Sequence, residues 1–249
     1  MRIAWATIVS TAVIILMAGC TTTTGSDMVA QSAGIPTGFI DKTLEVDGET
    51  RRFVVYVPRE YDPSREWPLI LFLHGAGERG DDGLKQTEVG LGRAVRLNAD
   101  RWPAIIVMPQ CPEGVWWDKA LPHVLVALEQ TLAEYSIDSK RVYLTGISMG
   151  GYATWIFGAQ QPDRFAALMP VCGGGDPGDA QALAAVPIWA FHGAKDDVVL
   201  PSESIRMVEA VREAGGKVEY TEFEDAGHNS WDDAYADRKA SRWLFNQSR

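Results

Sequence analysis

The segment Gly146-Ile147-Ser148-Met149-Gly150 joins a predicted strand at 141–145 to a predicted helix at 152–157. A serine between two glycines at such a junction is typical of a sharp turn that lifts the hydroxyl above a sheet. The small flanking residues let strand and helix approach closely, and the Met149 amide can stabilise an oxyanion beside Ser148. The pattern alone is weak evidence, because ordinary glycine and serine usage produces it by chance in roughly one chain in ten of this length.

Further apolar patterns place this serine within a series of strands and helices. Short apolar runs, typical of strands buried on both faces, lie at 69–73, 104–108, 141–145, 166–171 and 187–191, and a last strand is expected at 218–223. Apolar residues at three- and four-residue steps predict helices over 124–135, 205–211 and 235–245. A β-hairpin is predicted where the segments 39–46 and 51–57 alternate around Asp47-Gly48.

This order of elements predicts an α/β fold. Strands that alternate with helices form a mostly parallel central sheet with helices on both faces, here preceded by an N-terminal antiparallel hairpin. The longest connections, 75–103 and 173–186, are too short for a large cap domain. A chain of 249 residues can form such a fold as one unit. Its net charge of −10, without a basic stripe, argues against nucleic acid as a partner.

Two motifs downstream of Ser148 supply the groups that a nucleophilic serine needs. Asp196 and Asp197 follow the predicted strand at 187–191, and His228 follows the last predicted strand. The order Ser, Asp, His, with each residue just past a strand, matches the order of α/β-hydrolases, and ligands gather at that edge of an α/β sheet. We therefore predict that Ser148 attacks a carbonyl group, His228 accepts its proton, and one aspartate orients His228.

A glycine-rich turn, Leu73-His74-Gly75-Ala76-Gly77-Glu78-Arg79-Gly80, follows the predicted strand at 69–73. Glycines let the backbone approach an oxyanion closely, so this turn is expected to supply a second oxyanion donor. The alternative is a plain turn without a catalytic role. His74 and His192 compete with His228 for the role of general base, but we interpret both as structural because neither follows the last strand.

Four motifs together resemble one protein family. They are Gly146 to Gly151, Leu73 to Gly80, Pro109-Gln110-Cys111-Pro112 and Gly227-His228-Asn229-Ser230-Trp231. This set is similar to that of the secreted α/β-hydrolases known as predicted peptidases or phospholipase/carboxylesterases, which are near feruloyl and acetylxylan esterases and dienelactone hydrolases. The resemblance covers about 39–249 and implies an α/β-hydrolase fold and a serine esterase.

The resemblance also assigns roles to single residues. A His-Gly-x-x-Asp pattern of related esterases selects Asp196, four residues after His192, as the partner of His228, and leaves Asp197 as a solvent-facing or loop-capping carboxylate. A His-Gly-x-Gly pattern names the Ala76 amide as the second oxyanion donor, paired with that of Met149.

Tryptophans near the predicted site could hold a substrate. Trp116-Trp117-Asp118 is expected in the loop after the strand at 104–108, and Trp231 follows the catalytic histidine. Trp117 and Trp231 are predicted to form a flat apolar wall, with core packing as the alternative. Without a cap domain the site is expected to be open, which suits a small-molecule ester with a short or aromatic acyl group, or such an ester linked to a glycan.

No cofactor and no metal are predicted. The four histidines are isolated, and no two cysteines are closely spaced. Cys111 and Cys172 each lie just past a predicted strand, and an exported protein can hold them either as a disulfide or as two buried thiols.

The first residues predict export. Arg2 is a short basic segment, and 3–17 is largely apolar but too short to span a bilayer, as in a signal peptide. The segment ends at Leu16-Met17-Ala18-Gly19-Cys20, which resembles a bacterial lipobox with Met17 in place of the usual Leu. Cys20 would then be lipidated, and Thr21 in place of Asp implies the outer membrane. The alternative is ordinary secretion with an incidental cysteine.

The chain is therefore expected to comprise a lipoprotein signal peptide (1–19), a flexible tether (20–38) and an α/β-hydrolase catalytic domain (39–249). The leading hypothesis is a serine carboxylesterase anchored to a membrane through Cys20. A peptidase or amidase of prolyl-oligopeptidase type could use the same residues. A glycan-binding lipoprotein without activity is disfavoured, because a binder does not require Ser148, Asp196, His228 and the glycine-rich turn together.

Overall fold

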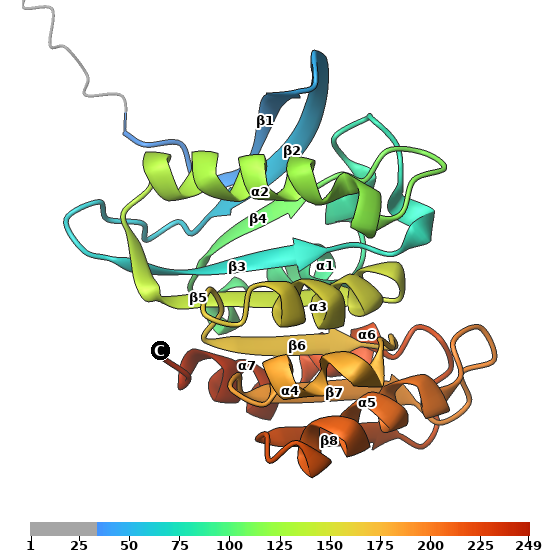
Figure 1. The fold of residues 1–249 in the computed structure, drawn as a ribbon. Helices are drawn as coiled ribbons and strands as arrows, with labels where there is room; N and C mark the ends of the chain where they lie inside the picture. The colour runs from blue at the N-terminus through green and yellow to red at the C-terminus, as the bar shows by residue number, and fades with distance from the viewer. Residues whose placement is uncertain (1–33) are drawn as a thin grey trace, which may run out of the picture. The chain divides into compact units, whose positions relative to one another are not determined.

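The computed structural model describes residues 34–249, which contain one eight-stranded sheet flanked by helices (Figure 1). The strand order is β1-β2-β4-β3-β5-β6-β7-β8. The strands are β1 Gly38–Val46, β2 Glu49–Val57, β3 Trp67–Leu73, β4 Ile105–Pro109, β5 Ile137–Ile147, β6 Ala167–Val171, β7 Ile188–Gly193 and β8 Val218–Phe223. The predicted signal peptide, most of the predicted tether and Cys20 lie outside the described residues.

Strand pairing confirms the predicted mixed sheet. β1 pairs with β2 and β2 pairs with β4 in antiparallel directions, and every later pair is parallel. Asp47 and Gly48 join β1 to β2 with φ angles of 53° and 79°. Positive φ at both central residues gives the turn the twist that a two-residue hairpin needs, and a glycine adopts it without steric cost.

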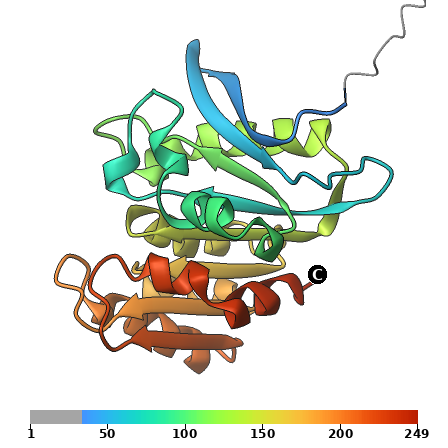
Figure 2. The ribbon, with the colours of Figure 1, turned by 180° about the vertical axis from the view of Figure 1, so that it is seen from behind.

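Helices cover both faces of the sheet, as the alternation of patterns predicts. α2, α3, α4 and α5 lie in front in Figure 1, and Figure 2 shows α1, α6 and α7 on the opposite face. The helices are α1 Gly90–Leu97, α2 Trp117–Glu134, α3 Met149–Gln160, α4 Ala180–Leu183, α5 Pro201–Glu213, α6 Trp231–Ala236 and α7 Arg238–Phe245. Short 3-10 turns are η1 Ala76–Glu78, η2 Lys85–Thr87, η3 Ala99–Arg101 and η4 Pro177–Asp179.

Two sequence expectations about helices were wrong, and two helices were missed. α2 begins at Trp117 and not in the 124–135 pattern, so Trp117 and Asp118 are helical and do not lie in a loop. The C-terminal pattern is two helices, because Asp237 ends α6 and caps α7 through a hydrogen bond from the Lys239 amide. α1 and α4 were not predicted at all.

The parallel strands all end at one edge of the sheet, on the right in Figure 1. The connections that leave this edge after β3, β5, β7 and β8 carry the glycine-rich turn, Ser148, Asp196 and His228. Between residues 34 and 249, no helix combines the length and apolar character that crossing a membrane requires.

Candidate active site

Ser148 occupies a strained position between β5 and α3. Its φ and ψ are 51° and −114°, a conformation that costs a residue with a side chain about 1–3 kcal/mol. Hydrogen bonds hold it there, because the Ser148 amide donates to Val171 O at 3.0 Å and the Tyr152 amide donates to Ser148 O at 3.0 Å. The backbone therefore forms the sharp turn that the Gly-x-Ser-x-Gly pattern predicts.

The glycines of this turn are needed for close packing. A Cβ atom at Gly146 would lie 2.3 Å from Gly150 O, and one at Gly150 would lie 1.9 Å from Leu73 O. A Cβ atom at Gly151 would lie 2.3 Å from Val171 O. The start of α3 thus presses directly on the ends of β3 and β6, and the serine is presented where these backbones meet.

Ser148, His228 and Asp196 form one continuous chain of hydrogen bonds. His228 Nε2 lies 2.9 Å from Ser148 Oγ, and His228 Nδ1 lies 2.8 Å from Asp196 Oδ2. A carboxylate accepts only, so Nδ1 carries the proton and Nε2 is the atom that accepts from the serine hydroxyl. Asp196 is buried, whereas Asp197 is exposed to solvent. The geometry brings together the three residues that the sequence singles out, with Asp196 rather than Asp197 against His228.

Asp196 is fixed as a carboxylate by several donors. Its Oδ1 accepts hydrogen bonds from the amides of Val198 and Val199 at 3.0 and 2.9 Å. Burial alone would raise the pKa of Asp196, but the hydrogen bonds from His228 and from these amides outweigh burial and lower that pKa. Asp196 therefore stays charged and can stabilise a positive charge that forms on His228.

The glycine-rich turn lies directly beside the serine. A Cβ atom at Gly75 would be 3.6 Å from Ser148 Cβ. Ala76 is the first residue of η1, and Met149 is the first residue of α3. Amides at the start of a helix have no partner within that helix, so both can point at an external acceptor. The two predicted oxyanion donors are thus the first residues of two helices that begin close to Ser148.

His74 stabilises the glycine-rich turn through hydrogen bonds and is not part of the hydrogen-bond chain of Ser148. Its Nδ1 donates to Gly75 O at 2.6 Å, and its Nε2 accepts from the Cys111 amide at 2.9 Å. Trp117 Nε1 donates to His74 O at 3.0 Å. Burial lowers the pKa of His74 to about 4, so the ring is neutral at pH 7, as an acceptor at Nε2 requires. The interpretation of His74 as structural fits these contacts.

The low pKa of His74 predicts a stability that depends on pH. Below the unfolded pKa of about 6.5, the unfolded chain takes up a proton that folded His74 excludes until about pH 4. The stabilisation by neutral His74 is therefore fully present above pH 6.5 and is lost as the pH falls. We expect the difference in unfolding free energy between the wild type and His74→Gln to shrink by about 2 kcal/mol from pH 7 to pH 5. Urea unfolding at both pH values measures it, and a constant difference would contradict the assignment.

The three tryptophans near the site have different environments. Trp117 is only 1% exposed, so its indole is part of the core. There it packs edge-on against the ring of His74, with 4.8 Å between the ring centroids. Trp231 is half-buried, and its ring meets that of His228 edge-on at 5.4 Å. Trp116 is 55% exposed. The sequence favoured Trp117 as a contact for substrate, but Trp116 is the member of the pair that offers an open surface.

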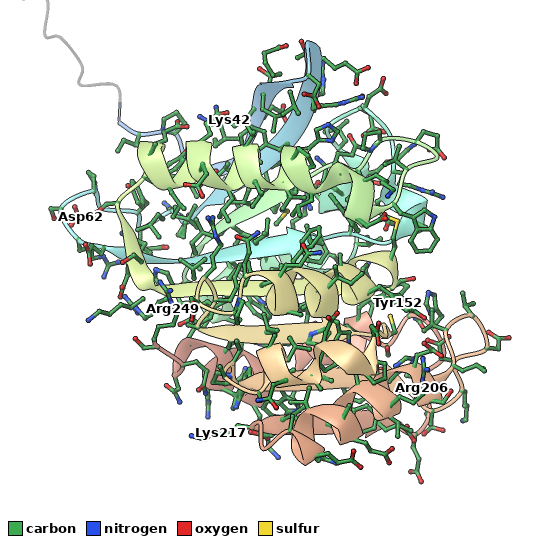
Figure 3. All side chains as sticks on the ribbon, in the orientation of Figure 1. Lys42, Asp62, Tyr152, Arg206, Lys217 and Arg249 are labelled. Atoms are coloured by element: carbon green, nitrogen blue, oxygen red, sulfur yellow. The ribbon has the colours of Figure 1, made fainter. Side chains whose placement is uncertain are left out.

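A mainly apolar hollow of about 550 Å³ reaches Met149, the residue that follows the serine. Its lining comes from the start of α2 and from one face of α3, and Figure 3 labels Tyr152 of this face at the edge where the strands end. The lining residues are Gly114, Val115, Trp116, Trp117, Asp118, Lys119, Met149, Tyr152, Ala153 and Ile156. Sequence reasoning did not single out Val115, Tyr152 or Ile156, because they become neighbours only when α2 packs against α3.

The two cysteines of the described part of the chain are free and buried. Cys111 and Cys172 do not form a disulfide. They follow β4 and β6, and β3 and β5 lie between these two strands in the sheet. Burial raises the pKa of each thiol to about 12. Ligand atoms of Cys172, Asp196 and His228 lie within 4.8 Å of one another. A protonated thiol beside an aspartate and a histidine that already bind each other is a poor metal site.

Comparisons with known proteins agree with this geometry. The chain is 34% identical over 157 residues to a bifunctional acetylxylan esterase/xylanase of Neocallimastix patriciarum, an alignment that covers 61% of this chain and 22% of that protein. It is 26% identical to a probable feruloyl esterase C of Aspergillus terreus, over 72% of this chain and 67% of the relative. The chain thus spans about a fifth of the first relative and about two thirds of the second.

Solved structures show the same fold. The crystal structure of a thermostable esterase matches with a TM-score of 0.78 and 36% identity, over 85% of this chain and 63% of the other. A feruloyl esterase module from Clostridium thermocellum matches with a TM-score of 0.68 at 18% identity, over 84% of this chain and 88% of the other, which is evidence for the fold alone. The family model described as the dienelactone hydrolase family matches residues 100–243, more than half of the sequence, and includes the serine, aspartate and histidine of the site. The chain belongs to the dienelactone hydrolase family.

Proposed function

We propose that this protein is a serine carboxylesterase. The observation that carries the proposal is the unbroken chain from Ser148 Oγ through His228 to Asp196, with distances of 2.9 and 2.8 Å. Two backbone amides at helix starts accompany it, at Ala76 and Met149. Relatives named as esterases support the same reaction class.

In the proposed reaction, Ser148 Oγ attacks the ester carbonyl carbon while His228 Nε2 takes the hydroxyl proton. The carbonyl oxygen becomes an oxyanion, which the Ala76 and Met149 amides stabilise. As the C–O bond to the alcohol breaks, His228 returns the proton to the leaving alkoxide, and an acyl group remains on Ser148. Water then attacks the acyl carbon while His228 takes its proton, the bond from that carbon to Ser148 Oγ breaks as His228 returns the proton to Oγ, and the acid leaves. Asp196 holds the ring of His228 in the required tautomer throughout.

The hollow beside Met149 supports a short or aromatic acyl group. It is lined largely by apolar side chains, and exposed Trp116 gives it a flat wall. The short strand connections leave room for the alcohol to be part of a glycan. Two relatives are named as an acetylxylan esterase and a feruloyl esterase, that is, as enzymes for an acetyl or an aromatic acyl ester. These names support the proposed substrate class but do not define the acyl group.

Trp116→Ala tests the role of the hollow. We expect the KM for methyl ferulate to rise by about tenfold, because a stacked aromatic contact of about 1–1.5 kcal/mol is lost. The KM for p-nitrophenyl acetate should change less than twofold, since acetate is too small to reach the wall. Leu200→Ala is the matched control, because Leu200 is 59% exposed and lies outside the hollow. Equal changes for both esters would contradict the assignment.

The reaction class is tested with purified protein that begins after Cys20. Labelling by a fluorophosphonate probe is expected to be complete and to stop ester turnover. A panel of p-nitrophenyl acetate, p-nitrophenyl palmitate, methyl ferulate and a peptide p-nitroanilide then separates esterase from peptidase. Preference for the peptide, or for emulsified palmitate, would overturn the proposed substrate class.

We also infer that the chain is exported and lipidated. The support lies in the sequence alone, in the apolar segment at 3–17 and the lipobox-like residues ending at Cys20. The domain at 39–249 would then be held at the outer membrane by the tether at 20–38. Incorporation of labelled palmitate by cells that express the full chain measures this, with Cys20→Ser as the control. Equal labelling of both chains would exclude Cys20 as the anchor.

A further inference from the structure

A second histidine touches the aspartate of the site. His192 lies in β7 and is fully buried, and the reaction described above does not use it. Its Nε2 lies 3.2 Å from Asp196 Oδ2 and 2.8 Å from Val199 O. Its Nδ1 lies 2.8 Å from Ser204 Oγ of α5. Asp196 Oδ2 thus faces a ring nitrogen of His228 and a ring nitrogen of His192.

The hydrogen bonds around His192 fix where its protons are. Ser204 Oγ lies 2.7 Å from Gly173 O, which can only accept, so the single hydroxyl proton of Ser204 points at that carbonyl. Ser204 Oγ must then accept from His192 Nδ1, which therefore carries a proton. His192 Nε2 faces two acceptors, Val199 O and Asp196 Oδ2, and therefore carries a proton as well.

We propose that His192 is a positioning residue of the active site, a buried imidazolium that pairs with Asp196 and holds it toward His228. The proposal rests on the proposed function for its catalytic meaning. Breaking such a buried pair leaves an uncompensated charge, so both members hold each other in place. The same cation also ties the 196–199 turn to α5 through Val199 O and Ser204.

The charges around the pair fit a buried cation. Asp196 is the carboxylate in direct contact with His192, and His228 lies beyond it. From β8, Glu222 pairs with His192 in the strand register, and on α5 Glu203 precedes Ser204. The neutral groups close to Asp196 are the Tyr152 hydroxyl and the Cys172 thiol, whose pKa values are both raised by burial. No lysine or arginine contributes a salt bridge to Asp196 within residues 34–249.

A cation at His192 changes the electrostatics of the hydrogen-bond chain from Ser148 through His228 to Asp196. It compensates much of the negative charge of Asp196, so less of that charge acts on His228 than beside an unpaired carboxylate. A neutral His192 would have no such effect, and this difference makes the proposal testable.

The direct test is the ¹⁵N NMR spectrum of the histidine rings at pH 7, which needs no substrate. We expect both ring nitrogens of His192 to have the chemical shifts and proton couplings of N–H groups. His192→Gln, in which the signals vanish, assigns them. Ser204→Ala assigns them independently, because removal of the acceptor should leave one His192 nitrogen without a proton. A bare ring nitrogen on His192 in the wild type would overturn the proposal whether or not the protein is an esterase.

The second test is the pH profile of kcat/KM for p-nitrophenyl acetate. Its acid limb reports protonation of the free enzyme's base, and we expect His192→Gln to move it upward by about one pH unit. Ser204→Ala should move it in the same direction. His123→Gln, which removes a histidine from the distant helix α2, should leave it in place. Loss of activity in His192→Gln with no shift of the limb would mean a merely structural role and would overturn the proposal.

Discussion

Ser148→Ala is expected to lower kcat/KM for p-nitrophenyl acetate by about 10⁴-fold or more without changing the fold. The substitution removes the attacking oxygen and leaves the two oxyanion amides in place, so any residual rate comes from those amides and from binding. Alanine meets the same backbone strain at a φ of 51° as serine does. The thermal midpoint should therefore stay within a few degrees of the wild type. Steady-state rates and a fluorophosphonate titration measure the effect.

A control substitution at another serine distinguishes loss of the nucleophile from a general effect of replacing serine by alanine. Ser202 is exposed on α5, and Ser202→Ala should retain full activity.

Asp196→Asn should lose about 10⁴-fold in kcat, because an amide no longer enforces the correct tautomer of His228, whereas Asp197→Asn should be close to wild type. Ser148→Ala with more than about 1% of wild-type turnover would exclude Ser148 as the nucleophile.

Gly150→Ala is expected to destabilise the whole domain. The new methyl group would lie 1.9 Å from Leu73 O and 2.8 Å from His74 O, so α3 would have to move away from the end of β3. The neighbours are backbone atoms and cannot rotate aside. We expect a loss of about 4 kcal/mol or more, a large part of the total stability of a typical domain, and a fall in the thermal midpoint of about 10 °C or more.

Urea and thermal unfolding of the purified variants measure this loss. Gly77→Ala in η1 is the matched control, because a Cβ atom there meets nothing within 4 Å. It should change stability by less than about 0.5 kcal/mol. A Gly150→Ala variant that unfolds within about 3 °C of the wild type would mean that the start of α3 does not pack against β3 as described.

The parts of the structure that follow from local sequence could be predicted. The hairpin turn depends only on the positive φ angles of Asp47 and Gly48, and these two residue types favour such angles. Ser148, Asp196 and His228 could be grouped from the sequence, because each follows an apolar strand and parallel strands end at one edge. The choice of Asp196 over Asp197 came from a family resemblance, and its physical basis is that only Asp196 turns into the core.

Other parts depend on packing between distant segments. α1 contains Gly90 and Gly92, which are poor helix formers, and a Cβ atom at Gly90 would lie 2.9 Å from Phe72 Cζ of β3. Trp117 was expected in a loop, and it precedes the apolar period of α2, from which Pro122 separates it, so the local sequence gives no helical signal there. The contact of His192 with Ser204 has no local signal, because it exists only once α5 packs on β7. These features require the tertiary structure.

The sheet order also determines when this site can exist during folding. The proposed nucleophile Ser148 and its proposed base His228 are 80 residues apart, and the strands that bring them together are joined by parallel crossovers. Such non-local contacts form slowly. Large loops must close first, which costs chain entropy before any favourable contact energy is gained. A nascent chain that lacks β8 has a serine but no base beside it. The proposed reactivity of Ser148 therefore requires β8 and the segment that follows it, so it can arise only late in folding.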